Sequence, residues 1–211
     1  DLNRISLNAA KRNLSKIKTI FIKESIDNPE KIFDSLKKKK IFQDQILQVR
    51  SFVDHERGVN QITEKIFLKD KFINKHDKDV IGIGSRGEHI PSKIINNSLN
   101  TYYNKWSNYI SRFGIINLEV HKQSFKELKN NLDLNEGANF DFIQALSRQN
   151  LCKAKMQIYC MVNNNLKPEI LEAYPINTNF VRIVLGYYKK SKLSLNNKKR
   201  IFKKAINVLK K

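Results

Sequence analysis

Two largely apolar segments end on ionisable side chains, and this arrangement restricts the possible folds more than any other feature of the sequence. Residues 46–53 run into Asp54 and His55, and residues 115–120 run into His121. Apolar segments of this length are typical of strands near the centre of a parallel sheet. Because ligands of open α/β sheets bind just beyond the carboxyl ends of their strands, these three side chains are the first candidates for a functional site.

Segments with helical periodicity alternate with strand-like segments along the chain, which predicts βαβ units in an α/β fold. Asn28 precedes one of the helices, and Pro29 occupies its first position. The expected helices cover residues 5–17, a segment from 29 onward, 94–113, 124–132, 142–165 and 193–209, and the expected strands cover residues 19–22, 46–53, 115–121, 173–176 and 180–187.

Residues 56–92 interrupt this alternation, and we expect them to form an insert or lid within a single domain spanning residues 1–211. The segment is charged and irregular, and Gly82, Gly84 and Gly87 near its end match the letters of a GxGxxG phosphate-binding motif. That motif requires a preceding strand, and no convincing strand precedes these glycines. We therefore expect them to form a turn.

The formal net charge of +20 raises the question of a nucleic-acid partner. The basic runs are separate, however, at residues 37–40, 189–192 and 197–204, and Lys is favoured over Arg. Specific nucleic-acid sites concentrate Arg and aromatic side chains in one place. We therefore expect no nucleic-acid partner, although the charge would attract an acidic partner over long range.

We expect neither a membrane-spanning protein nor a secreted one. The sequence contains no run of eighteen apolar residues, and its first residues are polar and acidic rather than typical of a signal peptide. Cys152 and Cys160 lie eight residues apart in an apolar stretch, too far apart on a helix to form a disulfide bond. Free buried thiols are typical of a reducing compartment, so we expect a cytoplasmic protein.

Four segments in the same order resemble one known family. They read LQVRSFVDHER, GEHIPSKIINNSLNTYYNKW, RFGIINLEVH and FDFIQALSRQN, at residues 47–57, 87–106, 112–121 and 140–150. Three of them resemble the patterns LHVRSFLDHDR, RHGLLLLELH and YDATHGFSDQY, and the other resembles a DG-x-x-IP segment followed by a helix that reaches a Trp. The chain thus resembles class I S-adenosylmethionine-dependent methyltransferases associated with polyketide synthases, which C-methylate a carrier-bound acyl group.

This resemblance implies a Rossmann-like methyltransferase sheet with helices on both faces, a lid insert and an absent first strand. The first strand of the family and its glycine-rich loop would precede residue 1. Asp1 and Asn3 would lie at the end of the second strand, where an acidic residue accepts hydrogen bonds from the ribose hydroxyls of the cofactor, S-adenosylmethionine.

The resemblance also implies the site residues. His55, His121 and Gln149 are the expected catalytic residues, because C-methylation requires a base for the α-proton and stabilisation of the resulting enolate. Asp54, His121 and Gln149 could instead hold a divalent metal, iron or manganese, as a Lewis acid. The sequence does not decide between a base and a metal ligand.

Two functions from different classes follow. The first is methyl transfer from S-adenosylmethionine to a carrier-bound, polyketide-type acyl group, with an acyl carrier protein or another acidic protein as partner. The alternative is a non-catalytic basic binding module, either a degenerate methyltransferase remnant or an RNA-binding protein.

Overall fold

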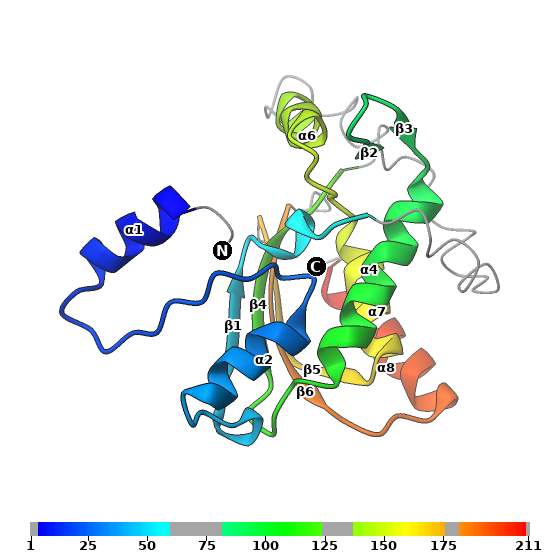
Figure 1. Ribbon diagram of the computed structural model, residues 1–211. Coiled ribbons are helices and arrows are strands. Elements are labelled where there is room, and N and C mark those ends of the chain that lie inside the picture. Colours follow the sequence, from blue (N-terminus) through cyan, green and yellow to red (C-terminus); the bar gives the residue numbers. More distant parts are fainter. Residues whose placement is uncertain (1–3, 60–81, 124–136, 176–181, 210–211) are drawn as a thin grey trace.

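The computed structural model describes residues 4–59, 82–123, 137–175 and 182–209 of the chain (Figure 1). The helices are α1 (Arg4–Asn13), α2 (Pro29–Lys38), α4 (Ser92–Ser107), α6 (Gly137–Leu146), α7 (Ala154–Asn163) and α8 (Leu195–Val208), with short 3-10 helices η1 (Gln43–Gln45) and η2 (Asp54–Glu56). The strands are β1 (Gln48–Ser51), β2 (Gly82–Ile83), β3 (His89–Ile90), β4 (Ile115–Val120), β5 (Leu166–Tyr174) and β6 (Ile183–Lys190). This mixed α/β architecture is compatible with a Rossmann-like fold.

Four strands form one sheet in the order β1-β4-β6-β5. Strands β1 and β4 are parallel and are connected through α4, so they form the βαβ unit predicted from the sequence. Strand β6 is antiparallel to both β4 and β5. The connection between β5 and β6 is short, as antiparallel pairing allows, whereas a parallel pair requires a crossover of a dozen or more residues.

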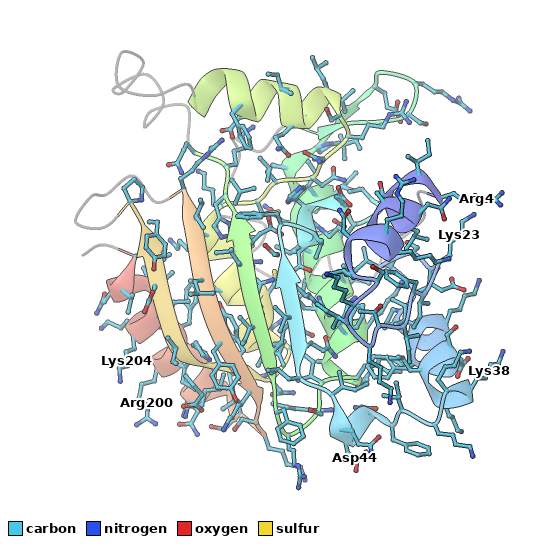
Figure 2. The ribbon with its side chains drawn as sticks, turned by 90° about the vertical axis from the view of Figure 1, so that its left-hand side faces the viewer. Arg4, Lys23, Lys38, Asp44, Arg200 and Lys204 are labelled. Carbon is cyan, nitrogen blue, oxygen red and sulfur yellow. The ribbon has the colours of Figure 1, made fainter. Side chains whose placement is uncertain are left out.

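Helices α4, α7 and α8 lie on one face of the sheet, and α7 contacts α4, α8 and β5 (Figure 1). Helix α4 places Ile95, Leu99 and Trp106 in the core at helical spacing. Figure 2 shows the sheet from the opposite face, which these three helices do not cover. On that face Val49 is 67% exposed. Among the described residues, helices therefore cover one face of the sheet, whereas the resemblance implies helices on both faces.

Several expected elements differ from those observed. The predicted strand at residues 19–22 is wrong, because that segment pairs with no strand in the described part of the chain. The predicted helix at 142–165 is two helices, α6 and α7, and Arg148, with a φ of 59°, lies at the break. The expected strand at 173–176 instead begins at Leu166 as β5. The possible helix at 124–132 lies outside the described residues.

Part of the predicted insert, residues 60–81, also lies outside the described residues. Further along it, β2 and β3 pair as an antiparallel hairpin. The amide of Gly84 donates to the carbonyl of Glu88, and Gly87 adopts a φ of +80°, a left-handed conformation that favours glycine. Gly84 and Gly87 therefore lie in the expected turn, whereas Gly82 lies in β2. Cys152 and Cys160 are free and buried, as predicted. Among the described helices, none is long and apolar enough to cross a membrane.

Candidate functional site

The carboxyl ends of the parallel strands β1 and β4 bring the predicted site residues together. After β1, Phe52 adopts a φ of +54°, and the chain turns into η2, which carries Asp54 and His55. Strand β4 ends at Val120, directly before His121. All three side chains are buried, with Asp54 and His121 each only 1% exposed. The structure thus places chemistry-bearing groups at the edge of the sheet where ligands of such folds bind.

Asp54 is the centre of a buried hydrogen-bond network. Its carboxylate accepts hydrogen bonds from Tyr102 (2.7 Å), Tyr103 (2.6 Å) and the Asn117 amide (2.6 Å), and it pairs with Arg50 at 3.1 Å. Burial raises the pKa of both tyrosines well above 10, so both hydroxyls remain protonated donors. The network connects β1, η2, α4 and β4. Asp54 therefore has an evident structural role, since a buried carboxylate is tolerated only when it is paired and hydrogen-bonded.

His55 forms a pair with Glu119 of β4. Its Nδ1 lies 2.7 Å from Oε1 of Glu119, and the other carboxylate oxygen accepts the backbone N–H of Asp54 at 2.8 Å. A carboxylate only accepts hydrogen bonds, so Nδ1 of His55 carries a hydrogen. In the neutral imidazole, Nε2 is then the nitrogen with a free lone pair. This is the geometry of a histidine base oriented by a carboxylate.

His121 is held in a similar orientation by a different acceptor. Its Nδ1 lies 3.3 Å from the carbonyl oxygen of Cys152, which can only accept, so Nδ1 carries the hydrogen here as well. Its Nε2 is buried and has no hydrogen-bond partner among the described residues. Burial lowers the pKa of His121 to about 4. His121 is therefore a neutral acceptor, not a cation, near neutral pH.

A small cavity of about 10 Å³ joins these groups. That volume is about enough for one water molecule. Its lining includes three predicted residues, Asp54, His55 and His121, together with Arg57, Leu99, Glu119, Val120, Asn150, Cys152 and Gln157.

The polar lining residues that sequence reasoning missed are Arg57, Glu119, Asn150 and Gln157. A signal for Glu119 existed, because Asn117, Glu119 and His121 alternate with apolar residues and so share one face of the strand. Arg57 and Asn150 connect η2 to the segment after α6: Arg57 donates to the carbonyl of Asn150 at 2.8 Å. No periodic pattern marks these two residues, since each lies outside helices and strands.

The remaining predicted residues lie apart from this cluster or outside the described ranges. Gln149 does not line the cavity, although its neighbour Asn150 does. The backbone N–H of Gln149 donates to the carbonyl of Gln144 at the end of α6. Asp1 and Asn3 lie outside the described residues, so their predicted contacts with a cofactor remain predictions.

The predicted metal ligands do not fit a metal centre as placed. Asp54 and His121 share the cavity with each other but not with Gln149. The carboxylate of Asp54 is already engaged by Arg50 and three neutral donors, which coordination of a cation would displace. Within the described ranges, no group of three or more His, Cys, Asp and Glu side chains is arranged to hold a metal ion.

A larger groove of about 510 Å³ adjoins the site between α2, α4 and β1. Phe33 and Trp106 provide aromatic walls, and Val53 and Glu56 line its end next to Asp54 and His55. A volume of this size, with mostly apolar walls and few polar groups, is typical of sites for small molecules and cofactors.

The fold and this strand-end cluster define a mixed α/β protein, compatible with a Rossmann-like fold, that carries a candidate acid–base site. Comparison with known protein families is more specific: the family model for the AprA MT2-like domain matches residues 1–186. The chain therefore belongs to this methyltransferase family, which confirms the resemblance found in its sequence. A comparison with curated proteins gave no match.

Proposed function

We propose that this protein transfers a methyl group from S-adenosylmethionine to the α-carbon of an acyl thioester that is carried on a partner protein. The observation that supports this reaction is the buried His55–Glu119 pair at the carboxyl end of a parallel strand pair. The membership in a methyltransferase family supplies the reaction class.

His55 is the base in this proposal. Its Nε2 accepts the α-proton, and the electron pair of the broken C–H bond forms the new bond to the methyl carbon. When bound, S-adenosylmethionine would supply the methyl group as an electrophile and leave as a neutral thioether. Glu119, 2.7 Å from Nδ1, stabilises the imidazolium that results, as the carboxylate does in a catalytic triad.

His121 has a different role because it is neutral. A histidine whose pKa is about 4 cannot stabilise an enolate oxygen as a cation near neutral pH. Its unpartnered Nε2 can instead accept a hydrogen bond from a group that enters the cavity. We therefore assign it to the orientation of substrate or water beside His55.

The described cavity is too small for an acyl group, so substrate entry requires movement. The contacts that close it join η2 to residues 147–153. The backbone N–H of Asn150 donates to the carbonyl of His55 at 2.7 Å, and its side-chain amide donates to the carbonyl of Arg57 at 3.1 Å. We propose that substrate binding displaces Asn150 from η2.

The groove along β1 is the proposed seat of the cofactor. Ile32, Phe33 and Leu36 offer half-buried apolar surface for an adenine ring, and the carboxylates of Glu24 and Glu56 suit ribose hydroxyls or a sulfonium cation. We expect Asp1 and Asn3 to add contacts with the ribose. The positive charge of the chain would favour docking of an acidic carrier protein.

Incubation with deuteromethyl-labelled S-adenosylmethionine and a panel of acyl thioesters on a carrier protein tests this function. We expect mass spectrometry to find one or more labelled methyl groups on the α-carbon. His55→Gln should abolish the transfer, and His89→Gln, at an exposed position, is the matched control that should retain it.

Binding is tested separately by calorimetric titration with S-adenosylmethionine and by the fluorescence of Trp106, the single tryptophan of the chain. Heat release accompanied by a fluorescence change supports the proposed groove. Salt-sensitive RNA binding without affinity for the cofactor would instead support the non-catalytic alternative.

A further inference from the structure

A second concave surface lies away from the candidate site, between α7 and α8. This α7–α8 groove has a volume of about 290 Å³, and Tyr159, Val162, Leu195 and Phe202 provide most of its apolar lining. Leu195, the first residue of α8, is 69% exposed at one end of the groove. The site described above uses none of these residues.

The surroundings of the groove are strongly basic. Residues 173–211 contain no Asp or Glu. Lys199 lines the groove, and Lys203 follows one helical turn later and is also exposed. Arg200 and Lys204 project from the same helix (Figure 2). An apolar surface flanked by cations of one sign is complementary to an apolar side chain flanked by carboxylates.

The walls of the groove are held in place. Lys198 donates from Nζ to the carbonyl of Asn163 at 2.6 Å, which fastens α8 to the last turn of α7. Tyr159 and Phe202 pack edge to face with ring centroids 5.5 Å apart. Because the planes of the two rings stand at 80° to each other, they do not form the parallel surfaces on which successive nucleic-acid bases stack. The surface is also concave, whereas membrane-binding helices insert protruding apolar side chains.

We propose that the α7–α8 groove binds an acidic amphipathic helix of a partner protein. One large apolar side chain of that helix occupies the space between Val162, Leu195 and Phe202, and neighbouring carboxylates pair with Lys199 and Lys203. This is the helix-in-groove mode of recognition, with charge selecting the partner. The inference stands apart from the proposed methyl transfer, because it uses no residue of the strand-end site.

Fluorescence anisotropy with a labelled synthetic peptide tests the proposal. The probe is a helix-forming peptide of about four turns with leucines on one face and glutamates beside them. We expect it to bind the full chain at near-physiological salt. The charge reversal Lys199→Glu with Lys203→Glu should weaken binding at least about tenfold, and Leu195→Ser should weaken it several-fold.

The matched control is Lys23→Glu with Lys38→Glu, which makes the same change in net charge at exposed positions on the opposite edge of the molecule (Figure 2). It should change affinity less than about twofold, because exposed charges at the opposite edge of the molecule are largely screened at this ionic strength. Circular dichroism confirms that each variant is folded.

Three results would overturn the proposal. Equal losses of affinity in the two charge-reversal variants would show that the net charge of the chain alone, and not the groove, attracts the peptide. Equal binding of a peptide with alanines in place of leucines would show that the groove is unused. Binding of single-stranded RNA or anionic lipid vesicles, but not of the peptide, would assign the surface to another class of partner.

Discussion

The buried state of His121 makes the stability of this protein depend on pH in a specific way. Burial lowers the pKa of the folded-state imidazole to about 4, against about 6.5 for an unperturbed histidine. Between these values the unfolded chain binds a proton that the folded chain does not, so acidification favours unfolding. The free energy of unfolding falls by about 1.4 kcal/mol per pH unit below pH 6.5, where the unfolded imidazole becomes protonated. Between pH 7 and pH 5 the protein therefore loses about 2 kcal/mol of stability.

The loss would approach roughly 3 kcal/mol below pH 4, where both states are protonated. The assay is urea unfolding followed by circular dichroism at several pH values, for the wild type and for His121→Gln. The variant should lack this component of the pH dependence. His89→Gln, at an exposed position, should retain it and so controls for the loss of any histidine.

Carboxylates that titrate in the same range contribute equally to the wild type and both variants, so the difference between their slopes isolates His121. Parallel curves for the wild type and His121→Gln between pH 7 and 5 would refute the reasoning. So would direct observation by NMR that the imidazole of His121 titrates near pH 6.5 in the folded protein.

Three further substitutions test the packing that supports the site. Trp106→Ala should lower the free energy of unfolding by about 3–5 kcal/mol, because the ring is 5% exposed, and an unchanged melting temperature would contradict this. Asp54→Asn should cost roughly 3–5 kcal/mol in urea unfolding, since it leaves the buried Arg50 without its counter-charge, and a neutral result would show that the pair is dispensable. Gly114→Ala should lower the melting temperature by several degrees, because Gly114 has a φ of +82° and an added Cβ would meet the carbonyl of Tyr188. Normal stability of that variant would show that the turn before β4 is not constrained.

The sequence predicted the elements whose signals are local. Helix α2 begins at Pro29, as its position after Asn28 indicates. The runs before Asp54 and His121 contain the parallel strands β1 and β4, although β1 covers only Gln48–Ser51 of the predicted strand at 46–53. Neighbouring parallel strands end at the same edge of a sheet, which brings the residues that follow them together. Two of the three expected catalytic residues, His55 and His121, therefore share one cavity.

Features that depend on long-range pairing were not predictable in this way. The β-branched segment at 19–22 has the composition of a strand, but it pairs with no described strand, and a strand forms only with a hydrogen-bonded neighbour. Gln149 follows the positive φ of Arg148, which breaks the predicted helix and brings Asn150 to the cavity instead. The pairing of His55 with Glu119 spans 64 residues, and only the register of β1 against β4 reveals it.

The burial of His121 also changes what its substitution tests. From the sequence, a histidine at the end of a strand carries little packing, and its removal should affect activity alone. In the structure its side chain is almost fully enclosed, so His121→Ala would leave a cavity and combine a loss of stability with any loss of activity. His121→Gln is therefore the more informative variant.

The central claim is that His55, oriented by Glu119, removes an α-proton from the substrate. Deuterium exchange at the α-carbon of an acyl thioester tests this claim most directly. Mass spectrometry in D₂O would follow exchange in the absence of the methyl donor, so the readout is independent of methyl transfer. We predict enzyme-dependent exchange in the wild type, its loss in His55→Gln and a strong reduction in Glu119→Gln. Exchange at the wild-type rate in folded His55→Gln would contradict the account.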